Sequence, residues 1–179
     1  MFNNFNEYQT SPEHILWLLD GDKAAIRVEF LDGSSYKCVT GYQYWYLNGE
    51  LHRTDGPAVI YEDGTQRWYL NGKLHRTDGP AVIYANGDQA WCLNGNCHRT
   101  DGPAVIHANG DQFWFLNGKY HRTDGPAVIY PNGRQYWYLN DNLHRTDGPA
   151  VIHASGYQYW YLNGKKMTKK QHEKAIRQL

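Results

Sequence analysis

The chain has 179 residues and no formal net charge, with 18 Lys plus Arg against 18 Asp plus Glu, and 15% of it is aromatic. Balanced charge provides no bulk positive field for nucleic acid or an anionic membrane, and no run of about 20 apolar residues predicts a membrane span. The seven Trp and fifteen Tyr fit a thin structure, in which rings bury one face, better than a thick aliphatic core.

The cysteines and the first residues bear on the compartment. Cys38, Cys92 and Cys97 are odd in number and have no Cys-x-x-Cys spacing. The N-terminus lacks the charged-then-apolar order of a signal peptide. We therefore expect three free thiols in a cytoplasmic protein, or in the host cytoplasm if the protein is viral.

Residues 1–40 are predicted to form an N-terminal cap. Ser11, Pro12 and Glu13 are typical of a helix start, and the apolar residues 15–19 follow, so we expect a helix over about residues 12–19. The period-two pattern of residues 25–30 and the segment 35–39 then predict an irregular hairpin.

A repeat region occupies residues 41–165. The nine residues His-Arg-Thr-Asp-Gly-Pro-Ala-Val-Ile begin at His52 and recur unchanged, 23 residues apart, at His75, His98, His121 and His144. A preceding block, Gly-x-Gln-x-Trp-(aromatic or Cys)-Leu-Asn, begins at Gly41, Gly64, Gly87, Gly110, Gly133 and Gly156. A fixed period of this length is typical of repeat proteins, in which each unit contacts mainly its neighbours.

Each unit reads as a β-hairpin. Residues 43–47 predict a strand with Gln43, Trp45 and Leu47 on one constant face, which we expect to be buried, and variable residues on the other. An Asn-Gly pair predicts a tight turn, residues 54–57 a kink, and residues 58–61 the second strand. The fold class is therefore all-β: a single-layer antiparallel sheet of about six tandem 23-residue hairpins with short terminal capping helices.

Residues 166–179 are predicted to form the C-terminal cap. Thr168 and Gln171 have the spacing of a capping box, and Ala175, Ile176 and Leu179 form an apolar stripe at helical spacing. We expect a helix from about Lys169, folded over the last hairpin.

The repeat resembles a known family. Trp-Tyr-Leu-Asn-Gly-Lys-x-His-Arg, followed by Tyr-Ala-Asn-Gly-Asp, across residues 68–88, is similar to a MORN (membrane occupation and recognition nexus) repeat, and more closely to MORN-like variants of bacteria and viruses. The chain departs from the family where Arg-Thr-Asp-Gly-Pro follows the His. The resemblance implies an open sheet of hairpins and a non-catalytic scaffold, and suggests a phage-encoded factor that occupies a host protein.

The repeated motif carries the only residues that suggest reactivity. His52, Thr54 and Asp55 could be written as base, nucleophile and orienting acid, but a catalytic site needs one convergent arrangement and this motif occurs five times. Units about 10 Å apart would also hold their single His residues too far apart to share one zinc ion. We therefore expect no enzyme activity, no metal and no cofactor. Instead, each Asp is expected to pair with an Arg of its own or the next unit and so join neighbouring units.

A protein partner is the favoured ligand, because the variable face mixes aromatic and Arg side chains as interfaces do. The predicted partner-binding residues are Tyr44, Arg67, Phe113, Tyr136 and Tyr159. The alternative is an anionic, phosphate-bearing small molecule bound along His75, Arg76, His98, Arg99, His121 and Arg122. A third interpretation is self-association through a sheet edge, whereas zero net charge argues against nucleic acid and membrane.

Overall fold

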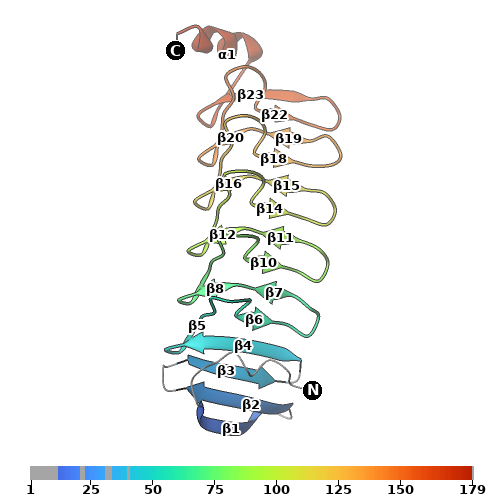
Figure 1. Cartoon of the computed structure of the whole chain (residues 1–179). Coiled ribbons are helices and arrows are strands. Elements are labelled where there is room, and N and C mark those ends of the chain that lie inside the picture. Colours follow the sequence, from blue (N-terminus) through green and yellow to red (C-terminus); the bar gives the residue numbers. More distant parts are fainter. Residues whose placement is uncertain (1–11, 21–22, 31–33, 40, 179) are drawn as a thin grey trace. The chain divides into compact units, whose positions relative to one another are not determined.

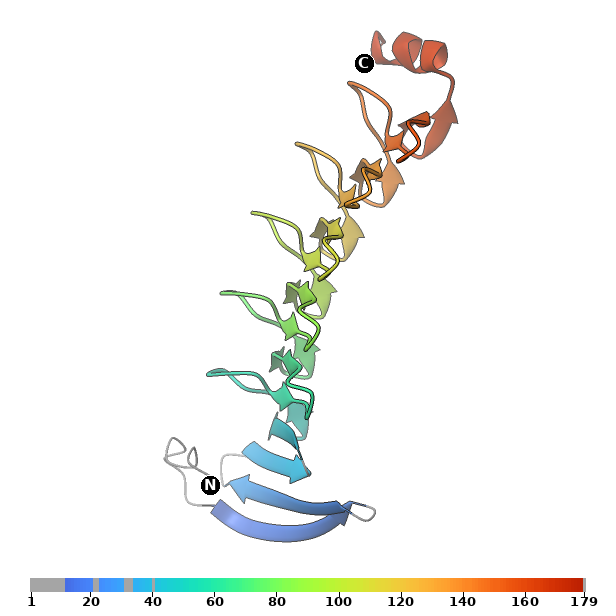
Figure 2. The ribbon, with the colours of Figure 1, turned by 90° about the vertical axis from the view of Figure 1, so that its right-hand side faces the viewer.

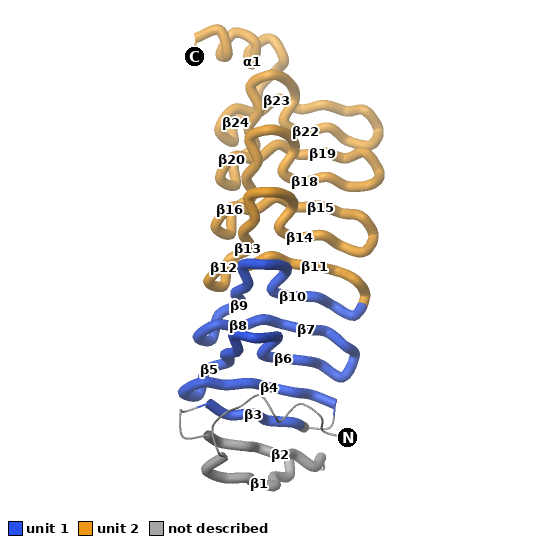
Figure 3. Tube along the Cα trace, viewed as in Figure 1, with its two compact units in different colours: residues 1–85 blue, residues 86–179 orange. Residues whose placement is uncertain are grey.

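The computed structural model describes residues 12–20, 23–30, 34–39 and 41–178, and the chain divides into two compact units, residues 1–85 and 86–179 (Figure 3). The expected helix start at Ser11, the turn at residues 32–33 and Leu179 lie outside the described residues. The boundary between the units falls within the repeats, in a turn between two strands. Each unit contains an antiparallel sheet, as the repeat pattern predicts.

The sheet of the first unit has the strand order β1-β2-β3-β4-β6-β7-β10, with β5 paired to β4 and a separate hairpin β8-β9 (Figure 1). The strands are β1 (Pro12–Asp20), β2 (Lys23–Phe30), β3 (Ser34–Val39), β4 (Tyr42–Leu47), β5 (Glu50–Leu51), β6 (Val59–Ile60), β7 (Gln66–Arg67), β8 (Tyr69–Leu70), β9 (Lys73–Leu74) and β10 (Val82–Ile83).

The sheet of the second unit has the order β11-β14-β15-β18-β19-β22-β23-β24, and its small hairpins are β12-β13, β16-β17 and β20-β21 (Figure 1). Its elements are β11 (Gln89–Ala90), β12 (Cys92–Leu93), β13 (Asn96–Cys97), β14 (Val105–Ile106), β15 (Gln112–Phe113), β16 (Phe115–Leu116), β17 (Lys119–Tyr120), β18 (Val128–Ile129), β19 (Gln135–Tyr136), β20 (Tyr138–Leu139), β21 (Asn142–Leu143), β22 (Val151–Ile152), β23 (Gln158–Leu162), β24 (Lys165–Met167) and helix α1 (Lys169–Ile176).

The predicted N-terminal helix at residues 12–19 is wrong. Pro12–Asp20 is strand β1, which pairs antiparallel with β2 and places Trp17 opposite Ile26. A helix start signal is a weak local preference, and tertiary pairing readily overrides it. Here the neighbouring segment is itself a strand, and a hairpin satisfies the backbone groups of both. The hairpin of β2 and β3 is confirmed, with Val28 opposite Tyr36.

The hairpin turns of the repeats follow the prediction. The Asn of every turn has positive φ, from 47° to 51°, and the residue after it is a positive-φ Gly or, once, Asp141. The kink is also confirmed, since residues 54–57 lie outside the strands. In the middle repeats the predicted strand breaks at the Trp: β15 ends at Phe113, Trp114 donates its N–H to the Ala127 carbonyl, and β16 begins at Phe115. In the second unit the small hairpins and the turns after β14, β18 and β22 lie at opposite ends of the short strands (Figure 1).

The fully buried residues are small. The Ala of each repeated motif is 0% exposed, and Val59, Val82, Val128 and Val151 are 2–4% exposed, whereas the six repeat Trp rings are half-buried. The expected burial of the Trp face is therefore only partial. A single-layer sheet has no second layer to cover its rings, so the deepest positions are those beneath other side chains of the same face.

Helix α1 ends the chain as predicted. Thr168 accepts a hydrogen bond from the Gln171 N–H, and the Gln171 side chain accepts one from the Thr168 N–H, which completes the capping box. The expected C-terminal segment 166–179 begins with the end of β24. His172 is 3% exposed and its Nε2 lies 2.7 Å from the Arg145 carbonyl oxygen, which fixes the helix on the last copy of the repeated motif (Figure 2).

Candidate binding surface

Each copy of the repeated motif forms a bend around an arginine. The Arg122 guanidinium carbon lies 4.1 Å from the centre of the Trp114 ring, and its Nε donates to Asp124 at 2.9 Å. Its Nη1 donates to the Pro126 carbonyl at 3.3 Å. The same stack, with ring distances of 4.0–4.1 Å, occurs at Arg53, Arg76, Arg99 and Arg145. Hydrogen bonds from the guanidinium are the first cause of the lowered pKa of all five bend Asp residues.

The close fit of the arginine explains the glycine of the motif. A Cβ at Gly125 would lie 3.0 Å from the Arg122 Cζ, and the corresponding distances in the other bends are 2.9–3.1 Å. Contacts this short require the guanidinium to shift from the position that it has in the bend. Each of the residues Arg, Asp, Gly, Pro and Ala therefore has a packing or hydrogen-bonding role in its own bend.

Each Asp pairs with the Arg of its own unit, one of the two pairings predicted, so that the pairs lie within bends and the expectation that they join neighbouring units is wrong. Asp lies two residues after its Arg in the same turn, which makes the local pairing shorter than any reach to the next unit. Neighbouring repeats are joined instead by the histidines. Within the second unit, Nδ1 of His98, His121 and His144 lies 2.7–2.9 Å from the side-chain oxygen of the next turn's Asn.

The histidine link can form with the proton on either ring nitrogen. Nδ1 of His98 accepts the Asn117 backbone N–H at 3.2 Å, which the neutral ring can do with its proton on Nε2. A protonated Nδ1 would instead donate to the Asn117 side chain. In the first unit, His52 makes both contacts with Asn71.

The residues predicted to bind an anion lie in these bends. Arg99 and Arg122 border an open groove of about 520 Å³ together with Trp114 and His121. Asp101 and Asp124 border it as well, so an anion would compete with carboxylates that already hold the guanidinium groups. Arg76 is bound in the same way by Asp78, and His75 and His98 lead into their bends.

The opposite side of the second unit carries a continuous set of rings, which we call the aromatic face. Predicted residues Phe113, Tyr136 and Tyr159 lie in one row, and Val128 and Val151 lie between them in register. The row buries these valines, whereas Val105, which has Ala90 on one side, is less buried. The face consists of His107, Phe113, Phe115, Tyr120, Tyr130, Tyr136, Tyr138, His153 and Tyr159, all half-buried.

The rings of the aromatic face contact one another from repeat to repeat. The ring centres of Tyr120 and Tyr138 lie 5.3 Å apart in a stacked pair, and those of Tyr136 and His153 lie 6.4 Å apart. Burial is the first cause that raises the pKa of Tyr120 and of Tyr138, so both phenols stay protonated near neutral pH. The face therefore offers flat apolar surface with hydroxyl groups.

Two cations lie on the aromatic face. The Arg134 guanidinium lies over Tyr130 and Tyr136, at 5.5 and 5.7 Å, and its Nη2 donates to the Tyr136 hydroxyl. Its Nε is buried and has no hydrogen-bond partner. The Lys166 Nζ lies 4.3 Å above the Tyr159 ring. These cations differ from the bend arginines because no carboxylate is paired with them in the described ion pairs.

The first unit has a shorter version of this arrangement. Predicted residues Tyr44 and Arg67 lie on either side of Val59, which is 2% exposed. Arg67 lies over the rings of Tyr61 and Tyr84, at 5.0 and 5.8 Å, and its Nε is also buried without a partner.

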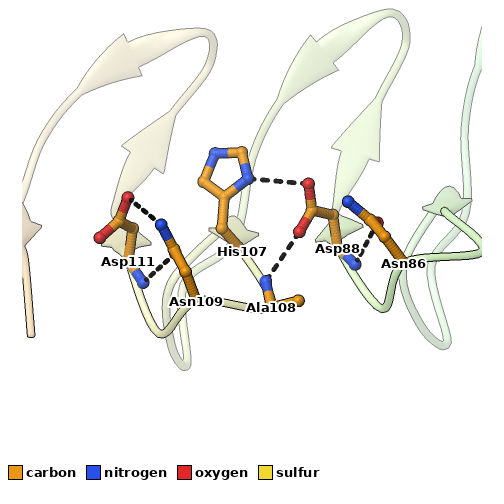
Figure 4. A network of polar contacts seen from close by, with 6 residues as sticks. All are labelled: Asn86, Asp88, His107, Ala108, Asn109 and Asp111. Carbon is orange, nitrogen blue, oxygen red and sulfur yellow. Dashed lines mark hydrogen bonds and ion pairs between the residues drawn. The ribbon is translucent and has the colours of Figure 1, made fainter.

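Polar side chains link successive turns at the end of the strands. Asp88 accepts from the Ala108 N–H at 2.7 Å, and its other oxygen lies 2.9 Å from His107 Nδ1 (Figure 4). The Ala108 N–H is the first cause of the lowered pKa of Asp88. Pro131 has no N–H to continue this ladder at Asp111, whose carboxylate instead accepts from the Asn109 side chain.

The prediction of the aromatic face was incomplete. Besides the predicted row, the face includes rings next to the Trp, such as Phe115, and rings after the second strand, such as Tyr130. The signal was present, because both positions share a face with the predicted row by period-two alternation. His107 and His153 stand where other repeats have a Tyr and pack as rings do there, with the ring centre of His107 5.3 Å from that of Phe113 in an edge-on contact.

Compared with models of known families and with curated proteins, the sequence matches none of them. The MORN-like character of the repeats therefore stays a prediction from the motif. Within the described residues, no helix has both the length and the apolar character needed to cross a bilayer.

Proposed function

We propose that the protein is a non-catalytic scaffold that binds a protein partner through the aromatic face of residues 86–179. The observation that carries the proposal is the unbroken series of half-buried rings from His107 to Tyr159, accompanied by Arg134 and Lys166. Aromatic residues and Arg provide most hot spots of protein interfaces, because they bury much area at low entropic cost.

The chemistry of the face favours an extended partner segment with apolar and acidic side chains. Rings supply flat apolar contact, while the cations above Tyr136 and Tyr159 complement a carboxylate. The resemblance to bacterial and viral MORN-like repeats favours a bacterial host protein as the partner, in agreement with a phage-encoded factor. A cytoplasmic location belongs to the same proposal.

The test compares two triple variants of the whole chain. The variant of the face carries Phe113→Ala, Tyr136→Ala and Tyr159→Ala, and Ala is acceptable there because the third repeat has Ala90 at this position. The control carries Gln112→Ala, Gln135→Ala and Gln158→Ala, adjacent residues on the other side of the same strands.

Both variants and the parent protein would be immobilised and exposed to bacterial lysate, and captured proteins would then be purified and titrated by calorimetry. We expect one protein to bind the parent and the control with similar Kd and to bind the face variant at least about tenfold more weakly, since each lost ring contact costs about 1 kcal/mol or more. A partner that binds all three equally would refute this site.

The anionic-ligand alternative gives a different result. A nucleotide that raises the melting temperature of the parent protein and of the face variant alike would place its site in the bends. In the Arg99→Ala and Arg122→Ala variants, the nucleotide should then no longer raise the melting temperature.

A further inference from the structure

Strands β12 and β13 carry the only pair of cysteines that face each other among the described residues. In the other small hairpins of the second unit the corresponding pairs are Phe115 with Tyr120 and Tyr138 with Leu143, whereas here Cys92 faces Cys97. Both substitutions fall in one hairpin and on opposite strands. They replace one ring-containing pair next to the aromatic face by two thiols.

The backbone register places this pair where a disulfide can form. His98 donates its N–H to the Trp91 carbonyl, so positions 91 and 98 are hydrogen-bonded and Cys92 and Cys97 form the non-hydrogen-bonded pair between them and the turn. Such pairs have Cα atoms about 4.5 Å apart, at the short end of the range that disulfides span. The two sulfur atoms already lie 4.0 Å apart as free thiols.

We propose that Cys92 and Cys97 are a thiol–disulfide exchange site that reacts with a low-molecular-weight disulfide and closes a reversible cross-link within the hairpin. The inference does not depend on the proposed partner. Because the Cα separation expected for such a pair lies within the range of disulfides, the cross-link can close and open without a large backbone movement.

The two thiols have different roles in the reaction. The Cys97 side chain is half-exposed, and the hydrogen bond from the Cys92 thiol lowers the pKa of Cys97 to about 7. The same hydrogen bond, and then burial, raises the pKa of Cys92, which is 3% exposed. Cys97 is therefore the attacking thiolate, and Cys92 is the resolving thiol.

The exchange proceeds in two balanced steps. The Cys97 Sγ attacks one sulfur of the small disulfide, a mixed disulfide forms, and one thiolate leaves and takes a proton from water. Cys92 then loses its proton to solvent, and its Sγ attacks the Cys97 Sγ, which forms the Cys92–Cys97 bond and expels the second thiolate. The two cysteines are oxidised, and one small disulfide is reduced to two thiols.

The experiment uses the native full-length chain and glutathione disulfide as the probe. The tryptic peptide of residues 77–99 contains Cys92 and Cys97 but not Cys38. We expect this peptide to lose the mass of two hydrogens and to resist alkylation, and dithiothreitol to restore both thiols. A Cys38→Ser variant should behave in the same way.

Two further variants keep the test decisive. Cys92→Ala should stop at a stable glutathione adduct on Cys97. The double variant Cys92→Tyr, Cys97→Leu restores the pairing of Tyr138 with Leu143, and should melt normally while losing the reaction of this hairpin. If glutathione disulfide leaves both thiols of the native peptide open to alkylation, or only adds glutathione to each, the proposal is wrong.

Discussion

The bends and the aromatic face both place an arginine over aromatic rings, but they satisfy it differently. In a bend, the Arg122 guanidinium stacks on the Trp114 ring. Its Nε–H donates to the Asp124 carboxylate, and its Nη1 donates to the Pro126 carbonyl. Arg134 on the aromatic face lies over Tyr136, and its Nε is buried without a hydrogen-bond partner. The first arginine has its charge and its Nε satisfied locally, whereas the second has neither a carboxylate in the described ion pairs nor a partner for its Nε.

This difference matches the sequence variation along the repeats. The nine residues that contain the bend are identical in five copies, and a change at the Arg, Asp or Gly would disturb contacts of the stacked guanidinium. The positions of the aromatic face need only cover a valine, which Tyr, Phe and Arg can all do. We infer that the bends maintain the repeats and that the aromatic face tolerates more variation.

The largest expected effect comes from residues 113 and 114, which are neighbours on opposite sides of the sheet. Trp114→Ala removes the ring beneath Arg122 and leaves its guanidinium without a stacking surface, so we expect a loss of about 3 kcal/mol in the free energy of unfolding. Phe113→Ala, which resembles the natural Ala90, should cost about 1 kcal/mol. Urea unfolding of both variants measures the comparison, and equal losses would show that the bend is not the more constrained region.

A smaller effect is expected from acid. The pKa of each bend Asp is lowered in the folded state by hydrogen bonds from its Arg. A lowered folded pKa means that the stabilisation is complete above the unfolded value, about 3.9, and is lost as the pH falls through the folded value. The melting temperature should therefore decline below about pH 4.

The control for the acid effect is Asp124→Asn, which cannot be charged at any pH. It should melt at a lower temperature than the parent protein at pH 7, and the difference should shrink towards pH 2. A difference that is constant from pH 7 to pH 2 would mean that the Arg122–Asp124 pair does not stabilise the folded state through its charge.

Much of the fold follows from the sequence, because the period, the Asn-Gly turns and the capping box at Thr168 are local signals that the structure keeps. The error at residues 12–19 arose where a local helix signal competed with pairing to a neighbouring strand. Pairing is a tertiary property, and no residue within the segment reports it.

The candidate surface was predictable only in part. Alternation places Phe113, Tyr136 and Tyr159 on one face, as the strand register shows. The stacking of Arg122 on Trp114 depends on a bend whose path the residue types alone do not define, and so the sequence left open whether each Asp pairs within its own unit or with the next. Contacts made across a kink are hard to predict, because the kink decides which side chains meet.

The smallest effect is expected at Asp141, the one departure from the Asn-Gly turn. Its φ of 66° is unfavourable for a residue with a side chain, so Asp141→Gly relieves about 1 kcal/mol of strain. The substitution also removes the carboxylate that accepts the Tyr120 N–H at 2.8 Å, a bond that contributes about 1 kcal/mol. Because the two terms oppose each other, we expect the free energy of unfolding to change by less than about 0.5 kcal/mol.

Asp141→Ala, which loses the bond and keeps the strain, should destabilise the protein by about 1 kcal/mol. If Asp141→Gly proved strongly destabilising, the bond to the Tyr120 backbone at the edge of the aromatic face would contribute more than the strain at Asp141 costs.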